Sequence, residues 1–223
     1  MLDQLDAQGF AITPSLLDES ECVTLSARFD LSGTDEAGQR NLLEQDWCAE
    51  LAGRLRQTLI QQDLLPNGYV ASQCTGFQKS VERNWLVPLH QDLSITVAER
   101  SADPALSGWA RKAGVLSVQP PAEVLQRLVA VRLHLDDCSD NDGPLMVVPG
   151  SHRHGRLNSQ QCTALRSQAG EVRCAVQRGA AMLMRPLLLH ASSRATGTSL
   201  RRVLHFVFGP RQLPCQLRWQ YSI

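Results

Sequence analysis

The stretch that decides the fold is RLVAVRLHLDD, residues 127–137. Four apolar residues occupy alternate positions and two polar ones stand between them: Val129, Val131, Leu133 and Leu135 alternate with Arg132 and His134. A period of two predicts a β-strand with one apolar face and one face that carries the polar pair. Further β-rich runs, separated by turns rich in Gly, Pro, Asn and Asp, lie at 69–79, 85–97, 144–152, 180–192 and 201–210.

The first third of the chain predicts helices instead. Leu17-Asp18-Glu19-Ser20 leads into the run ECVTLSARFDL (21–31), with acidic residues at its start, as a helix dipole prefers. Asp46 is expected to cap a second helix that the sequence Pro66-Asn67-Gly68 ends. The apolar stripe of that second helix is Leu51, Leu55, Leu59 and Ile60. Helices followed by many short strands predict an α+β, mainly β protein, a sandwich or barrel flanked by N-terminal helices. We expect one domain over 1–223, with its helical part at about 1–66 and its β core at about 67–210.

Composition excludes several classes of protein. Lys and Arg number 22, as do Asp and Glu, so the net charge is zero, whereas proteins that grip nucleic acid through its phosphates are usually basic. The seven cysteines include no C-x-x-C pair, which argues against a thiolate zinc site or a disulfide framework. The start of the chain has no signal-like apolar run, and no run approaches the ~20 residues of a membrane span. We therefore expect a cytoplasmic protein whose partner is a small molecule, not nucleic acid or a membrane.

Three separated segments carry candidate chemistry. His90-Gln91-Asp92 is an H-x-D motif, and residues two apart on a strand point to the same side. His190 ends an apolar run, and Arg201 follows eleven residues later at the start of another β-run. If a short turn joins two antiparallel strands there, Arg201 returns beside the face that holds His190. Two histidines and one carboxylate form the facial triad of non-haem Fe(II) oxygenases, and an arginine fork suits the carboxylate of a 2-oxoacid.

This order of motifs resembles the Fe(II)/2-oxoglutarate dioxygenases with a double-stranded β-helix, or jelly-roll, core. Three segments are similar to the phytanoyl-CoA dioxygenase family in particular: GFAITPSLLDESECVTL (9–25), NWLVPLHQDLSITV (84–97) and LDDCSDNDGPLMVVPGSH (135–152). The resemblance implies that His90, Asp92 and His190 bind Fe(II) and that Arg201 anchors 2-oxoglutarate. It also implies that O2 and 2-oxoglutarate are consumed, that succinate and CO2 form, and that a substrate is hydroxylated.

The sequence departs from the family pattern at Val203. Many relatives carry a hydroxyl residue there, two positions after the arginine, so a second contact to the cosubstrate must come from elsewhere. Lys79 is a candidate for that contact, although a solvated surface lysine is an equal alternative. Candidates for the substrate pocket are Trp85, Trp109, Arg132 and His134; core packing of the tryptophans and an outward orientation of the polar pair are the alternatives.

Several readings stay open at this stage. Residues 98–125 fit neither helix nor strand well and, with Trp109, are expected to form a mobile lid; a solvated insertion is the alternative. Asp92 favours hydroxylation over halogenation, because related halogenases usually lack that carboxylate. The competing function is a jelly-roll that binds a metal or small molecule without turnover, or a sensor. The substrate can be a CoA thioester or another small metabolite.

Overall fold

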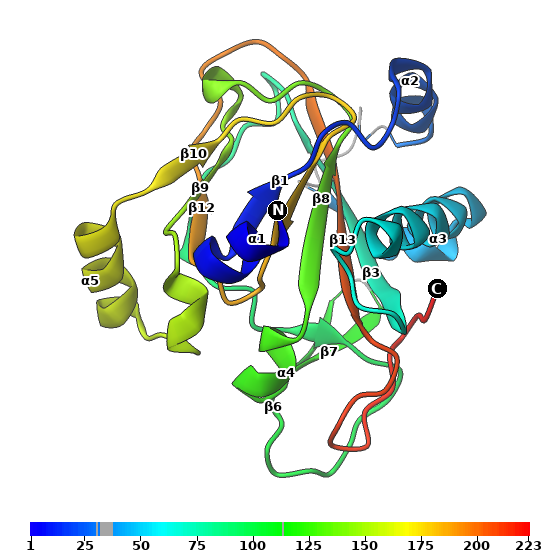
Figure 1. Ribbon diagram of the computed structural model, residues 1–223, viewed down its shortest axis with the longest axis vertical. Coiled ribbons are helices and arrows are strands. Elements are labelled where there is room, and N and C mark those ends of the chain that lie inside the picture. Colours follow the sequence, from blue (N-terminus) through cyan, green and yellow to red (C-terminus); the bar gives the residue numbers. More distant parts are fainter. Residues whose placement is uncertain (30, 32–37, 113) are drawn as a thin grey trace.

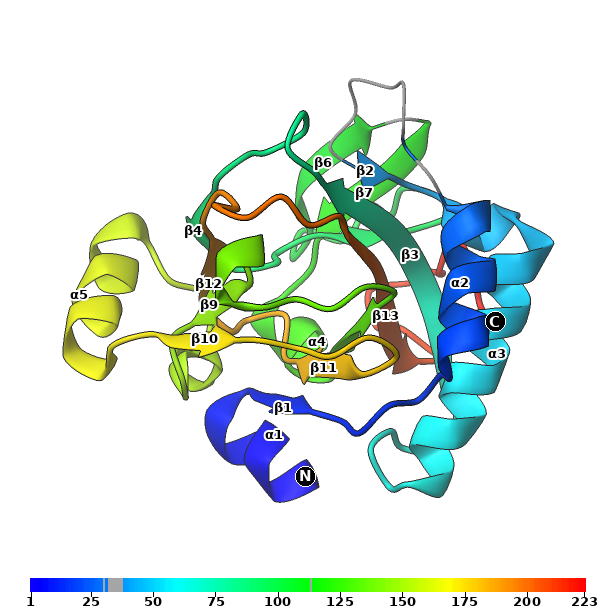
Figure 2. The same cartoon turned by 90° about the horizontal axis from the view of Figure 1, so that it is seen from above.

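Two antiparallel sheets face each other across the middle of the protein (Figures 1 and 2). The structure is a computed structural model, and it describes residues 1–29, 31, 38–112 and 114–223. The larger sheet has the order β1-β11-β8-β13-β3-β2. Its strands are β1 (Phe10–Ile12), β11 (Ala181–Met184), β8 (Val129–His134), β13 (Arg201–Pro210), β3 (Tyr69–Lys79) and β2 (Gly38–Gln39).

The smaller sheet has the order β10-β9-β12-β4. Its strands are β10 (Val172–Cys174), β9 (Leu145–Val147), β12 (His190–Ser192) and β4 (Val87–His90). A third sheet, of order β5-β7-β6, lies beyond one end of the other two and comprises β5 (Ile95–Thr96), β7 (Val115–Gln119) and β6 (Ser107–Lys112). The two facing antiparallel sheets are the predicted jelly roll.

Helices cover the outer face of the larger sheet. α2 (Glu19–Arg28) and α3 (Asp46–Gln61) lie beside β3 and β13 (Figure 2), and α1 (Leu2–Gln8) leads into β1. The apolar stripe of α3, including Leu51, Leu55 and Leu59, is buried in one cluster with the outward residues of β8 and β13. A 3-10 turn, Leu42–Glu44, precedes α3. Beyond the first third of the chain lie α4 (Ala122–Gln126), α5 (Ser159–Ala169) and the 3-10 turns Asp140–Asp142 and Ser151–His154.

The alternation read from residues 127–137 is confirmed. Val129, Val131 and Leu133 pack into the cluster beneath α3, whereas Arg132 points between the sheets into a cavity. β13 follows the same rule, because Arg201 lines that cavity while Arg202 faces outward and pairs with the Asp136 carboxylate at 2.8 Å. The inner face of the larger sheet therefore carries polar and charged side chains, which is unusual for the middle of a sandwich.

Four details of the sequence prediction are wrong. Asp46 is not the cap of α3: the cap residue is Gln45, and Asp46 lies in the first turn. The strand expected over 85–97 ends at His90, where the chain leaves the smaller sheet, and resumes as β5 in the third sheet. Residues 98–125 are not irregular, because β6, β7 and α4 account for most of them. β12 and β13 are not neighbours either: residues 193–200 cross from one sheet to the other.

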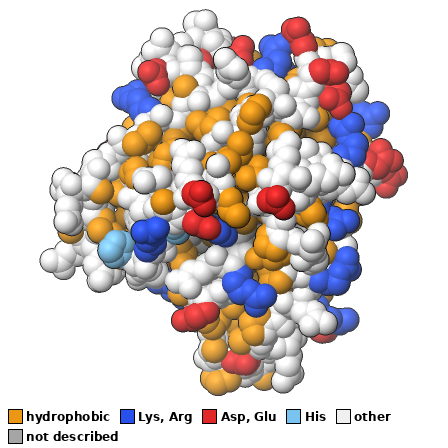
Figure 3. Space-filling view, viewed as in Figure 1, with side chains coloured by type: hydrophobic (Ala, Val, Ile, Leu, Met, Phe, Trp, Pro, Cys, Tyr) orange, Lys and Arg blue, Asp and Glu red, His pale blue; other side chains and the backbone are white. Residues whose placement is uncertain are grey.

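Surface properties agree with the neutral composition. On the face seen in Figure 3, the described basic and acidic side chains are interspersed and form no continuous basic area. Within the described part of the chain, no helix has both the length and the apolar character required to cross a bilayer.

Candidate metal centre

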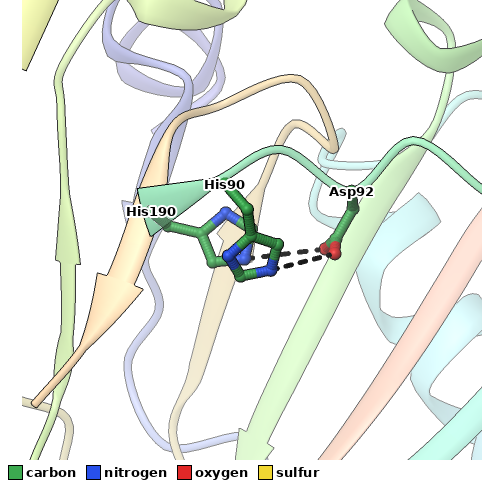
Figure 4. Close-up of side chains that lie close together, drawn as sticks. All are labelled: His90, Asp92 and His190. Atoms are coloured by element: carbon green, nitrogen blue, oxygen red, sulfur yellow. Dashed lines mark ion pairs between the residues drawn. The ribbon is translucent and has the colours of Figure 1, made fainter. Parts of the chain in front are cut away.

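His90, Asp92 and His190 come together at the edge of the smaller sheet (Figure 4). His90 and His190 are directly opposite each other on the paired strands β4 and β12, and their ring centroids are 4.2 Å apart. Asp92 lies just past the end of β4, where its backbone N–H donates to the carbonyl oxygen of Pro186 at 2.9 Å. One potential ligand atom from each of the three residues lies within 4.8 Å of the others.

Backbone carbonyls fix the tautomer of both imidazoles. Nδ1 of His90 lies 2.8 Å from the carbonyl oxygen of Pro88, and Nδ1 of His190 lies 2.9 Å from that of Leu188. A carbonyl oxygen only accepts hydrogen bonds, so each Nδ1 carries the hydrogen and each Nε2 presents a lone pair. This contact between the far ring nitrogen and a carbonyl is the arrangement that orients histidines bound to metals.

The carboxylate of Asp92 completes the triad without a hydrogen bond to either ring. Its oxygens lie 3.7 Å from Nε2 of His90 and 3.8 Å from Nε2 of His190, beyond hydrogen-bonding distance. Burial alone would raise the pKa of Asp92, but the imidazoles of His190, His205 and His90 together with Arg132 lower it. Burial lowers the pKa of His190. The site thus offers two imidazole nitrogens and one carboxylate, the donor set that suits Fe(II).

A cavity of about 520 Å³ opens between the sheets beside this triad. Its wall includes Trp85 on one side and three inward residues of the larger sheet on the other, namely Arg132, Arg201 and His205. A volume in this range accommodates a small-molecule ligand. His134 and Trp109 do not line it: His134 is buried beside Val203, and Trp109 packs in the third sheet with the Arg100 guanidinium 5.2 Å from its ring centroid.

Arg201 is held at the bottom of this cavity by one backbone carbonyl. Its Nη1 donates to the carbonyl oxygen of Gly143, while its buried Nε has no hydrogen-bond partner among the described residues. Ser192, two residues after His190, donates to the same carbonyl at 2.9 Å and accepts from Lys79 Nζ at 2.7 Å. Gly143 has φ +63°, and a Cβ there would lie 2.5 Å from the carbonyl oxygen of Ser193. Glycine at 143 thus lets this carbonyl reach both side chains.

Lys79 is buried beside Arg201 and is not a solvated surface residue. It is 1% exposed, pairs directly with Arg201 across β3 and β13, and lies 5.1 Å from the ring centroid of Trp85. Burial and the neighbouring Arg201 charge lower the pKa of Lys79 to about 8. Lys79 is not part of the cavity wall, but its ammonium contacts Ser192, which is, so Arg201 and Lys79 place two positive charges at or just behind this end of the cavity. Such an arrangement suits a carboxylate and fits 2-oxoglutarate.

Two residues of the site, His205 and Ser192, were not among the candidates expected from the sequence. His205 lines the cavity because it lies on the same face of β13 as Arg201 and Val203. Ser192 was not considered, although it follows His190 at the spacing that puts both on one face of β12. Alternation along β12 and β13 places Ser192 on the face of His190 and His205 on the face of Arg201, so the same period of two predicts both positions.

A jelly-roll core with a His-Asp-His triad defines the class of the protein: it is a non-haem iron, 2-oxoglutarate-dependent dioxygenase. Within that class the chain belongs to the phytanoyl-CoA dioxygenase family, which its sequence matches over residues 5–203. No curated protein matches the sequence significantly.

Solved structures share the fold at low sequence identity. EctD from S. alaskensis, in its apo form, aligns with a TM-score of 0.71 at 16% identity and covers 99% of this chain and 84% of its own. The carbocyclase SnoK from nogalamycin biosynthesis gives 0.67 at 14%, covering 94% and 82%. HygX from Streptomyces hygroscopicus, solved with nickel and 2-oxoglutarate, gives 0.63 at 19%, covering 93% and 86%.

Proposed function

We propose that the protein hydroxylates a small-molecule metabolite, with Fe(II) bound by His90, Asp92 and His190 and 2-oxoglutarate anchored by Arg201. The observation that carries this proposal is the orientation of the two imidazoles. Their Nε2 atoms and a carboxylate oxygen of Asp92 converge beside the cavity, as ligand atoms of one metal ion would. When bound, the iron and the 2-oxoacid supply dioxygen activation and C–H oxidation, with release of succinate and CO2.

The residues of this chain divide the remaining work between them. The backbone carbonyls of Pro88 and Leu188 keep the ligand rings in one tautomer, so no ring has to turn when the ion enters. Arg201, whose side chain lines the cavity, is assigned to the far carboxylate of 2-oxoglutarate. Lys79 and Ser192 stand beside it and supply the contacts that Val203, which has no hydroxyl, cannot make.

The cofactors are supported by the site and by the family rather than by any single relative. HygX has been solved with iron, and with nickel, 2-oxoglutarate and hygromycin B together. At about 20% identity that likeness extends to the fold, so it supports the position of a cavity but not the identity of the substrate. Asp92 occupies the third ligand position and leaves no place for a halide there, which supports hydroxylation.

The test is anaerobic addition of Fe(II) and then 2-oxoglutarate to the purified protein. An intact site should give a weak visible charge-transfer band, and substrate-dependent succinate should form once oxygen is admitted. His90→Ala, Asp92→Ala and His190→Ala should each remove the band, whereas His154→Ala, which changes an exposed histidine, should keep it. A wild-type protein that binds Fe(II) without a band on 2-oxoglutarate addition would instead be a metal-binding jelly roll without this chemistry.

A further inference from the structure

A second guanidinium is buried in the cavity besides Arg201. Arg132 is 8% exposed, lies at the centre of β8, and has its carbon Cζ 5.6 Å from the ring centroid of Phe77. Its Nε has no hydrogen-bond partner, and no described carboxylate lies within 4 Å of it; Asp92 acts on it only from a greater distance. A buried cation without a paired anion is costly, so a site that keeps one is suited to receive an anion.

His205 presents a second donor beside that guanidinium. Nη1 of Arg132 lies 3.0 Å from Nδ1 of His205 on the neighbouring strand β13. Arginine only donates, so Nδ1 accepts and the hydrogen of the neutral ring is on Nε2. Burial, and the Arg132 charge next, lower the pKa of His205 to about 3, which keeps the ring neutral. The Arg132–His205 pair, which lines the cavity, therefore offers N–H donors to whatever binds there.

The charges of the proposed cofactors do not neutralise this pair. Fe(II) and the two carboxylates of 2-oxoglutarate cancel each other, and Asp92 offsets one of the buried cations. Arg201 and Lys79 stand together at one end of β13, whereas Arg132 lies opposite His205, four residues along the strand. Because Asp92 offsets only one of the three buried cations Arg201, Lys79 and Arg132, two positive charges remain. The one on Arg132 acts on Asp92 and so lies near the triad, where it is available to a third component, the substrate.

A polar chamber adjoins the cavity on the side away from Arg201. This chamber, of about 300 Å³, shares Gln73, Thr75 and Gln119 with the cavity wall. Most of its lining consists of hydroxyl and amide side chains, with Arg40 as its charged residue: Arg40, Asn41, Gln73, Thr75, Ser94, Ile95, Thr96, Gly108, Ala110, Val115, Ser117 and Gln119. Such a lining suits a hydrogen-bonding group and not a long alkyl chain.

We propose that the substrate is a small, polar carboxylic acid whose carboxylate binds the Arg132–His205 pair and whose uncharged remainder extends into the polar chamber. This inference rests on the proposed function, because it assigns Arg201 to 2-oxoglutarate and the triad to iron. It places the substrate carboxylate close to the metal, so the oxidised carbon is a near neighbour of the carboxylate. Two outcomes compete with this proposal: the substrate is neutral, or 2-oxoglutarate itself binds Arg132.

The experiment uses protein loaded with Mn(II) and 2-oxoglutarate, which does not turn over. The probes are small hydroxy and amino acids, each paired with its own amide, and the readouts are binding by calorimetry and the shift in Tm. Variants are Arg132→Gln, Arg132→Lys and His205→Gln, with Arg211→Gln as the exposed-arginine control. The Kd of 2-oxoglutarate is measured for every variant before any probe is added.

At least one acid should bind the wild-type protein at least tenfold more tightly than its amide, since a charge-assisted contact is lost in the amide. Arg132→Gln should abolish that preference, Arg132→Lys should restore part of it, and His205→Gln should weaken it. In all of them the Kd of 2-oxoglutarate should stay within about threefold of the wild type.

Three results would overturn the inference: no acid in the panel preferred over its amide, the preference surviving in Arg132→Gln, or Arg132→Gln weakening 2-oxoglutarate as much as Arg201→Gln does. These outcomes leave the proposed function intact. Failure of the wild-type protein to bind 2-oxoglutarate at all would refute that function instead.

Discussion

Arg201→Gln and Arg202→Gln should change different properties of the protein, although the two arginines are adjacent in β13. Arg201 is 3% exposed and lines the cavity, whereas Arg202 forms a bidentate pair with Asp136 on the outer face, with Nε and Nη2 each 2.8 Å from a carboxylate oxygen. The first substitution should therefore weaken cosubstrate binding, and the second should lower stability.

The expected sizes follow from burial. Truncating one partner of a buried charge pair costs about 2–5 kcal/mol, so Arg201→Gln should raise the Kd of 2-oxoglutarate by about 30-fold to a few thousand-fold. The side chains of Arg202 and Asp136 are 17% and 11% exposed, so losing their pair should cost about 1–3 kcal/mol of folding free energy, or roughly 2–12 °C in Tm for a chain of this length.

The assay is anaerobic titration of 2-oxoglutarate into Fe(II)-loaded protein, with Tm measured on the same samples. Arg202→Gln should bind 2-oxoglutarate within about threefold of the wild type, and Arg201→Gln should remain folded. The reasoning is refuted if both substitutions weaken binding equally, or if Arg202→Gln weakens it more. Either result would mean that the strand register is displaced by one residue.

Three further predictions concern the same site. His90→Ala and Asp92→Ala should abolish Fe(II) binding with little change in Tm, because both side chains are more than a third exposed. His190→Ala should abolish Fe(II) binding and also lower Tm by several degrees, because the His190 side chain is 5% exposed. Fe(II) binding by any of the three variants would count against the triad. The pKa of Lys79 is about 8 in the folded protein and 10.5 ordinarily, so unfolding takes up a proton between these pH values. The free energy of unfolding should therefore increase through this group as the pH rises from about 8 to 10.5. In Lys79→Met, urea unfolding at pH 7.5 and 9.5 should show a smaller increase than in the wild type, and an equal increase would contradict the prediction. Gly143→Ala forces a Cβ against the Ser193 carbonyl, so it should lower Tm and weaken 2-oxoglutarate at least about tenfold; wild-type values for both would show that the carbonyl of Gly143 does not position Arg201.

The sequence carried the strand periodicity and the H-x-D motif, because both depend on local spacing. Alternation along 127–137 separated Arg132 from the apolar face but left its inward or outward orientation open, and in the structure it lines the cavity. The same alternation separates Arg201 from Arg202. The ligand residues could be grouped only through the family resemblance, since His90 and His190 are 100 positions apart and meet through the pairing of β4 with β12. Residue spacing contains no information about which distant strands pair.

The sequence-based predictions were wrong where long-range contacts, and not local spacing, determine the conformation of a segment. Residues 98–125 carry Gly108 and Gly114, which suggested a flexible lid, but both glycines have positive φ within or beside the β6–β7 hairpin. That hairpin packs Trp109 away from the cavity and brings Gln119 to its wall. Closure of this segment over a substrate stays a prediction. His134 was expected in the pocket, but it is not among the residues that line the cavity.

β13, near the end of the sequence, lies between β8 and β3 in the middle of the larger sheet. During synthesis, the edges of β8 and β3 must therefore wait unpaired until residues 201–210 have left the ribosome. Until then the nascent chain lacks Arg201, the proposed anchor of the cosubstrate, and the strand that joins the two halves of the sheet. A chain cut before residue 201 would accordingly be a folding failure exposed to aggregation and proteolysis, not a trimmed enzyme, and iron loading should follow release of the complete chain.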